Sequence, residues 1–403
     1  MEMILVEILG SDWLELALRW IHVIVGIAWI GSSFLFNWMD SQFEPAEPVR
    51  PGVAGEMWMV HGGGFYRVEK YLVAPERLPR MLHWFKWEAY TTWISGFSLL
   101  AVIYFLGAPV YLIDAATPFA PPVAVLAALA LLVAGWFVYD RLCRLLVGRG
   151  APVLAALVFA WTILVAAVAD ALFSGRAAYV LVGAMLGTIM AANVFRVIIP
   201  NQKLAVAAML AGERPEARLG IEAKQRSLHN NYITLPVLFV MISNHYPATF
   251  GQPYNWAILA ALAAIGIGVR HFFNLRNRGR TAPWILGAAA LAMVALAVVA
   301  TPRAPETETG AGGEAVPFRS VAAIVKTRCA ACHSAKPRYP GFDAPPKGVV
   351  FDRAGDIRAQ AARIYAQAVA SETMPLGNAT GMTADERATL GRWIGQGASL
   401  DAE

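Results

Sequence analysis

The sequence predicts an all-α protein, in which a membrane bundle of about eight helices is followed by a small helical domain. Hydrophobic residues make up 57% of the 403 positions and charged residues only 15%, which is more apolar than an ordinary soluble protein. The apolar residues form runs of roughly 18 to 27 residues, enough for a helix to cross a lipid bilayer. Residues 316–403 lack such runs and instead show apolar residues at helical spacing.

The predicted membrane domain covers residues 1–301. Its eight candidate spans are 13–39, 86–107, 119–139, 151–172, 177–199, 228–245, 254–272 and 283–301. The third and fourth consist mainly of small and aliphatic residues, and we expect them to be scaffold. In the fifth, Gly183 and Gly187 form a GxxxG pair that favours close helix packing. We expect Pro236 to kink the sixth.

Basic residues are concentrated in every second loop, namely 40–85, 140–150, 200–227 and 273–282. The loops between them are nearly free of Lys and Arg. By the positive-inside rule the basic loops are cytoplasmic, so both termini are predicted on the outer side. These loops also explain the net charge of +5, and no nucleic-acid partner is expected.

The end of the chain has the signals of a separate domain at 316–403. Residues 302–315 are rich in Pro, Gly and Glu and predict a flexible linker. Apolar residues at helical spacing predict a helix over 318–328. Thr383 followed by Glu386 is a capping-box signature and predicts the start of a terminal helix.

Between these two helices lies Cys329-Ala330-Ala331-Cys332-His333. This C-x-x-C-H pattern is typical of a c-type haem attachment site. Its two thiols can form thioethers to the haem vinyl groups, and the adjacent histidine supplies an axial ligand to the iron. A zinc knuckle and a redox dithiol are the alternatives. A zinc site needs four ligands, and no second cysteine pair lies nearby.

A second axial ligand is expected from a methionine. Met374 lies in a loop constrained by Pro375 and Gly377 and is our candidate, with Met382 as the alternative. We therefore expect one covalent haem c, whose iron is bound by His333 and Met374. Residues 316–400 resemble a class I cytochrome c domain, because they contain in order a helix, the C-x-x-C-H motif, a methionine loop and a terminal helix. The resemblance implies haem attachment outside the cytoplasmic membrane, in agreement with the loop charges.

Ionisable residues inside a bilayer are costly and are therefore candidate site residues. On the first span Glu15, Arg19 and His22 follow three- and four-residue steps along one helix face. They form a polar stripe that could belong to a site. The alternative is that Glu15 pairs with Arg19 and that His22 bonds to a neighbouring carbonyl.

Histidines occur at both predicted membrane levels. His22 and His245 belong to the outer half, whereas His61, His83, His229 and His271 belong to the cytoplasmic side. Pairs on facing helices could hold haem b, which is possible but not required. The alternatives are substrate binding, proton transfer and helix capping.

The chain resembles the bacterial membrane-bound urate oxidases. The resemblance lies in three segments of the membrane domain, 20–31, 193–196 and 228–236, together with the C-terminal haem domain. The resemblance implies oxidation of urate to 5-hydroxyisourate in purine degradation, in the bacterial cytoplasmic membrane. It also implies that electrons leave through haem c to a respiratory-chain acceptor, such as a soluble cytochrome c or a terminal oxidase. The cytochrome domain would then lie in the periplasm.

Urate is a planar anion, so its site should contain a guanidinium group, amides and an aromatic ring. A histidine could take a urate proton and activate water. On the cytoplasmic side these groups would come from Asn193, Arg196, His229, Asn230 and Asn231, and on the outer side from Arg19, His22, Trp29, Asn244 and His245. We expect the site near the first-span stripe, because an outer site shortens the electron path.

Two other functions are compatible with the same residues. The membrane domain could be a quinol- or haem-b-linked electron-transfer subunit without urate chemistry, with haem c as its exit. It could also be a transporter or sensor that carries a haem domain.

Overall fold

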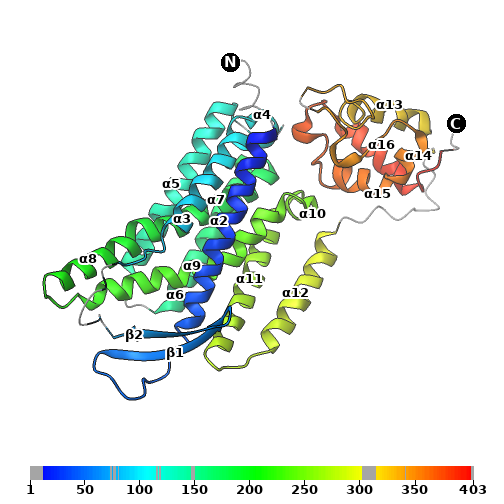
Figure 1. Ribbon diagram of the computed structural model, residues 1–403. Coiled ribbons are helices and arrows are strands. Elements are labelled where there is room, and N and C mark those ends of the chain that lie inside the picture. The colour runs from blue at the N-terminus through cyan, green and yellow to red at the C-terminus, as the bar shows by residue number, and fades with distance from the viewer. Residues whose placement is uncertain are drawn as a thin grey trace.

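The computed structural model describes residues 12–72, 75, 79, 81–114, 117, 119–146, 150–301, 315–340 and 342–400. Over these ranges the chain is mostly helical (Figure 1). A bundle of long helices comes first and a group of short helices forms the C-terminal part. All but the last residue of the predicted linker 302–315 lies outside the described residues.

Helices occupy all eight places where the sequence predicts a span. The helices at these places are α2 (Asp12–Met39), α3 (Trp87–Leu99), α5 (Pro121–Leu145), α6 (Ala151–Leu172), α7 (Gly175–Ala192), α9 (Ala217–Ser243), α11 (Asn255–Asn277) and α12 (Trp284–Ala300). A further helix, α8 (Ile199–Leu210), lies, except for its first residue, in the predicted loop 200–227. The π-helical segment η1 (Leu100–Phe105) continues α3, and η2 (Asn193–Ile198) joins α7 to α8. Two short helices, α4 (Ala108–Tyr111) and α10 (Pro247–Phe250), lie at the end nearest the C-terminal part.

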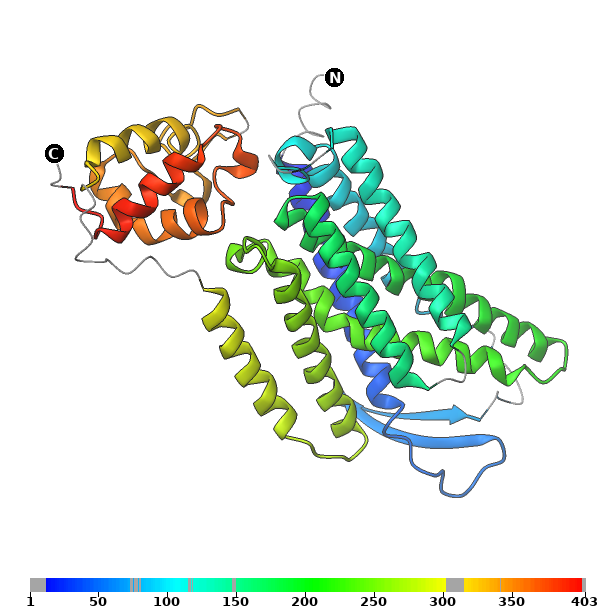
Figure 2. The ribbon, with the colours of Figure 1, turned by 180° about the vertical axis from the view of Figure 1, so that it is seen from behind.

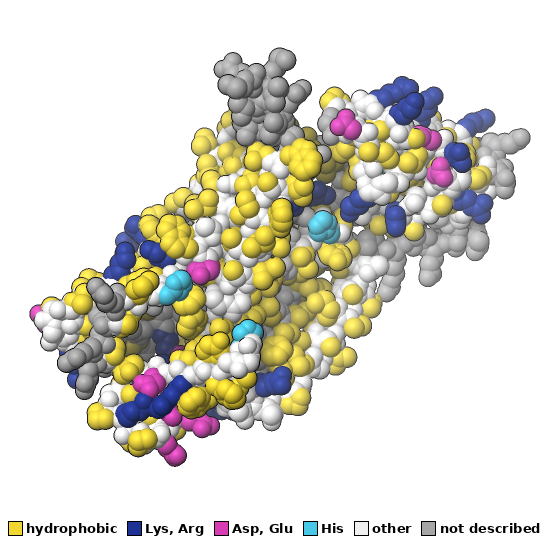
Figure 3. All heavy atoms as spheres, in the orientation of Figure 1, with side chains coloured by type: hydrophobic (Ala, Val, Ile, Leu, Met, Phe, Trp, Pro, Cys, Tyr) yellow, Lys and Arg dark blue, Asp and Glu magenta, His cyan; other side chains and the backbone are white. Residues whose placement is uncertain are grey.

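Five helical stretches of the described chain are long and apolar enough to cross a membrane. They are α2, α5, α6, α11 and the continuous stretch Gly175–Leu210. Helix α12 is apolar but shorter, and α9 begins with a charged segment. Figure 3 shows hydrophobic side chains over the flank of the bundle, with charged side chains gathered at the hairpin end and over the C-terminal part. Large side chains such as Trp20 and Ile27 are exposed on α2.

Helix α7 is central in the bundle, and most of its side chains are buried. It packs against α5, α6 and α9. A Cβ atom at Gly183 would lie only 2.4 Å from Val240 Cγ1, so glycine allows α7 and α9 to approach closely. A Cβ atom at Gly187 would have no neighbouring atom within 4 Å. Of the predicted GxxxG pair, only Gly183 therefore makes a close helix contact.

A β-hairpin between α2 and α3 corrects the all-α prediction. Strands β1 (Val53–His61) and β2 (Gly64–Tyr71) pair antiparallel. Gly62 and Gly63 form the two-residue turn, with φ angles of +58° and +80°, which glycine adopts readily. Ion pairs of Arg50 with Glu56 and Glu69 connect the strands to the preceding loop. The glycine run after His61 is thus a hairpin turn.

The C-terminal part has a hydrophobic core of its own, and its helices form a group apart from the long helices of the bundle (Figure 2). Its helices are α13 (Phe318–Arg328), α14 (Ala354–Ala359), α15 (Ala361–Ile364) and α16 (Ala384–Gly395), with short helical turns η3 (Pro346–Gly348), η4 (Tyr365–Ala370) and η5 (Leu376–Asn378). The helix predicted over 318–328 is confirmed. The capping box is also confirmed, because Thr383 and Glu386 bond reciprocally at the start of α16.

The loop 371–378 of the C-terminal part lies against the bundle. A Cβ atom at Gly251 would lie 2.4 Å from Ser371 Cβ, and one at Gly377 would lie 3.0 Å from the Val110 carbonyl oxygen. Both views of the ribbon place this side of the C-terminal part next to α4 and α10 (Figures 1 and 2). The loop that contains Met374 is therefore the surface that faces the bundle.

Candidate functional site

The C-x-x-C-H segment forms a compact turn directly after α13. The backbone N–H of His333 donates to the Cys329 carbonyl at 2.9 Å. The imidazole Nδ1 of His333 lies 3.1 Å from the Val349 carbonyl oxygen. A carbonyl can only accept, so Nδ1 must be the protonated nitrogen and Nε2 keeps its lone pair. Burial lowers the pKa of His333 and favours the neutral imidazole that a metal ligand requires.

Cys329 and Cys332 form no disulfide with each other, and burial raises the pKa of the Cys329 thiol to about 11. A redox dithiol needs an accessible thiolate of lowered pKa, so this environment does not favour that alternative. Among the described residues no three His, Cys, Asp or Glu side chains form a metal-binding group, so the structure gives no support to a zinc knuckle at Cys329 and Cys332. Two thiols and a histidine with a free Nε2 meet the requirements of a covalent haem site.

Met374 lies in a loop whose backbone is held at two points. Its N–H donates to the Gln367 carbonyl at 2.8 Å, and its carbonyl accepts from Arg387 Nη1 at 2.7 Å. The Met374 side chain is half-buried, whereas Met382 is only 3% exposed within the hydrophobic core. The backbone of Met374 is thus held in place in its loop, whereas Met382 packs within the hydrophobic core.

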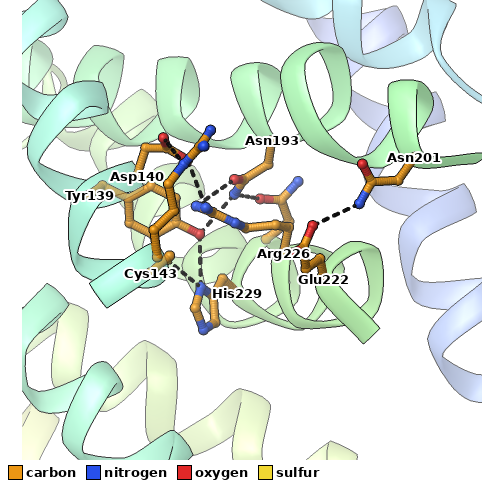
Figure 4. A network of polar contacts seen from close by, with 10 residues as sticks. Tyr139, Asp140, Cys143, Asn193, Asn201, Glu222, Arg226 and His229 are labelled. Atoms are coloured by element: carbon orange, nitrogen blue, oxygen red, sulfur yellow. Dashed lines mark hydrogen bonds and ion pairs between the residues drawn. The ribbon is translucent and has the colours of Figure 1, made fainter. Parts of the chain in front are cut away.

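A buried polar network connects α5, η2 and α9 (Figure 4). His229 Nδ1 lies 2.8 Å from the Tyr139 hydroxyl, and Asn193 Nδ2 donates to that hydroxyl at 3.0 Å. Asn193 Nδ2 also donates to Asn230 Oδ1 at 2.8 Å. Arg226 Nη2 forms an ion pair with Asp140 at 2.7 Å. The π-helical turn at η2 carries Asn193, and such turns are frequent at functional sites.

The network contains only part of the predicted cytoplasmic site. Asn193, His229 and Asn230 come together as expected, but Arg196 is exposed. The guanidinium of the network belongs to Arg226, which lies 3.4 Å from Asn193 Oδ1. The sequence places Arg226 in the basic loop 200–227, which gives no sign of a site residue, whereas in the structure it lies buried within α9.

The outer candidates do not form a common cluster through the hydrogen bonds of the described residues. Arg19 pairs with Glu15 one turn away at 2.6 Å, and both side chains are exposed. His22 Nδ1 lies 3.0 Å from Ser95 Oγ and 3.1 Å from the Thr92 carbonyl oxygen. His245 is exposed. This arrangement matches the alternative explanation of the stripe, in which these side chains pair locally or bond to the next helix.

A second buried polar group joins α9 to α11 and contains Asn231 of the predicted cytoplasmic site, together with Arg270 and Asn274, which the site prediction did not include. Arg270 Nε donates to Asn231 Oδ1 at 3.1 Å, and Asn274 Nδ2 donates to the same oxygen at 2.8 Å. The Arg270 guanidinium lies over the ring of Phe34 on α2, 3.7 Å from its centroid. Beside it, the Tyr232 hydroxyl lies 2.8 Å from His271 Nδ1.

Residues 9–301 match the family model described as urate oxidase N-terminal. The chain belongs to this urate oxidase family. Comparisons with curated proteins and with solved structures find no significant match. The urate oxidase region contains the whole helical bundle and both buried polar groups. The C-x-x-C-H segment lies outside it.

Proposed function

We propose that this urate oxidase is a membrane-bound enzyme that converts urate to 5-hydroxyisourate and passes the electrons through a covalent haem c. The family match supports urate as the substrate. The observation that carries the haem assignment is the hydrogen bond between His333 Nδ1 and the Val349 carbonyl, because it leaves Nε2 free as a ligand. Cys329 and Cys332 would hold the group covalently, and Met374 would complete the coordination.

The overall reaction has a simple balance. Urate and one water give 5-hydroxyisourate, two protons and two electrons. The haem supplies a one-electron acceptor, so each turnover delivers two electrons in succession to a respiratory-chain acceptor such as a soluble cytochrome c or a terminal oxidase. The protein must therefore bind a planar anion, release two protons and hold the electron acceptor against the bundle.

The contact of the loop 371–378 with the bundle supports this electron transfer. Aromatic rings follow α3, η1 and α4 towards the same contact. Trp93 stacks on Phe97 with 5.3 Å between ring centroids, and Phe97 contacts Phe105 at 6.3 Å. Tyr104 contacts Tyr111 at 6.1 Å, and Tyr111 directly follows Val110, which touches Gly377. These π systems lie along the side of the bundle that leads to the C-terminal part.

The proposed location is the bacterial cytoplasmic membrane, with all eight helical places as spans and both termini in the periplasm. Five sufficiently apolar stretches and the hydrophobic flank of the bundle support insertion. The alternation of basic loops supports the orientation. The periplasmic side is also where a c-type haem would be attached.

The test is anaerobic addition of urate to membranes that contain the full chain, with the haem absorbance as the readout. Reduction by urate but not by a quinol supports the proposal. Reduction by quinol alone would instead support the electron-transfer subunit without urate chemistry. A pyridine haemochrome spectrum counts the haems directly: the proposal requires one haem c, and a b-type haem in addition would assign a histidine pair of the bundle to it.

A further inference from the structure

The Arg270 group is unusual because it buries a cation without a carboxylate. Arg270 is 5% exposed, Asn231 1% and Asn274 6%. Among the ion pairs of the described residues, none involves Arg270. A buried charge that lacks an opposite charge is strongly unfavourable. The surroundings of Arg270 therefore favour the binding of an anion.

Three polar atoms of this group have no hydrogen-bond partner. Seven buried side-chain nitrogen and oxygen atoms of the described chain are unpartnered, and three of them are Arg270 Nη2, Asn231 Nδ2 and Asn274 Oδ1. Unpartnered buried polar atoms are rare in native proteins because each loses its hydrogen bonds to water. Their concentration at one place indicates a ligand that would bond to them.

The chemistry of the open atoms defines this ligand. Arg270 Nη2 and Asn231 Nδ2 are donors, whereas Asn274 Oδ1 is an acceptor. The complement is an anion with two acceptors and one N–H donor. The ring of Phe34 beside the guanidinium adds an apolar surface. The urate anion has this character, because carbonyl oxygens and N–H groups alternate along the edges of a flat ring system.

We propose that Arg270, Asn231 and Asn274 form the urate-binding site. This inference rests on the proposed urate oxidase function. The neighbouring network at Asn193 and Arg226 contributes none of the unpartnered atoms, and Arg226 is neutralised by Asp140. That network is therefore complete without a ligand. Arg270 and Asn274 lie near the end of α11 at the basic loop 273–282, so the proposal places urate at the predicted cytoplasmic end of the bundle and not at the first-span stripe.

The test is binding of radiolabelled urate to the full-length protein in detergent, with thermal unfolding measured with and without urate. We expect Arg270→Gln to weaken urate binding at least ~10-fold, since it removes a charged hydrogen-bond donor. Arg276→Gln removes an exposed charge from the same helix and should leave the affinity unchanged. Urate should raise the unfolding temperature of the wild type but not of Arg270→Gln.

Without urate, Arg270→Gln should be as stable as the wild type or more stable, because it removes an uncompensated buried charge. A large loss of stability in this variant would assign Arg270 a structural role and overturn the inference. Wild-type affinity in the variant would also overturn it while leaving the urate oxidase function intact. If the wild type neither binds urate nor is reduced by it, the proposed function itself fails.

Discussion

Gly251 of the helical bundle and Ser371 of the C-terminal part lie so close that no side chain fits between them. A Cβ atom at Gly251 would be 2.4 Å from Ser371 Cβ and 3.0 Å from Thr373 Cγ2. Gly251 has φ of −90°, an ordinary conformation for any residue, so the requirement for glycine is one of space. The contact involves the loop that also contains Met374, and it fixes the expected electron acceptor against the bundle.

Gly251→Ala should therefore slow the reduction of the haem by urate severalfold, because the added methyl group separates the two parts. Reduction by dithionite, which reaches the haem from solution, should keep its wild-type rate. Stopped-flow absorbance of the full chain measures both. Gly287→Ala is the control, since nothing lies within 4 Å of the Cβ position at Gly287. Equal urate-driven rates in Gly251→Ala and the wild type would show that this contact does not limit electron transfer.

Two arginines pair with Asp140, and they should contribute very differently to stability. Arg226 is 5% exposed in this ion pair, whereas Arg144 is 67% exposed. We expect Arg226→Gln to lower the free energy of unfolding by about 3 kcal/mol or more, because it leaves a largely buried carboxylate less well compensated. Arg144→Gln should cost about 0.5 kcal/mol or less. Thermal unfolding in detergent compares them, and similar losses would contradict this difference.

The places of the helices were predictable, because apolar runs of spanning length leave little choice of structure. The hairpin was not predicted, because the sequence analysis treats the whole of 40–85 as a loop, whereas β1 and β2 lie within it. The start of α9 was missed for a different reason. Its charged residues were assigned to a loop, although Arg218 and Glu222 pair one turn apart on a helix.

Polar contacts could be predicted only between residues that the sequence places at helix ends on the same side of the membrane. Asn193 and His229 were expected in one site because both lie at cytoplasmic helix ends. Tyr139 looked like the end of a scaffold helix, and its contact with His229 depends on how α5 packs on α9. The pairing of Arg270 with Asn231 likewise depends on helix packing, which spacing along one helix does not reveal.

The stability of the C-terminal part should depend on the ionisation of Glu386. Burial opposes ionisation of this carboxyl group, but hydrogen bonds from Thr383 and Arg328 outweigh it and hold the pKa below its usual value. A lowered pKa in the folded state stabilises the fold above the unfolded pKa of about 4.3, and this contribution is lost as the pH falls through the folded pKa.

Thermal unfolding of the haem-loaded full chain, followed at the haem absorbance, should thus shift to lower temperature below about pH 4.3. Glu386→Gln should be less stable than the wild type at pH 7 and should show a weaker pH dependence in the acid range. A variant with the same acid dependence as the wild type would assign that dependence to other groups.

Met374 and Met382 should respond to substitution in opposite ways. Met382 is 3% exposed in the hydrophobic core, so Met382→Ala should lower the free energy of unfolding by about 2–5 kcal/mol and keep the methionine–iron charge-transfer absorption. Met374 is half-buried, so Met374→Ala should cost less stability but abolish that absorption. A visible spectrum of the oxidised protein and a thermal unfolding curve separate the two effects. If the absorption persists in Met374→Ala and disappears in Met382→Ala, the axial ligand is Met382, and the loop held by Gln367 and Arg387 serves only the contact with the bundle.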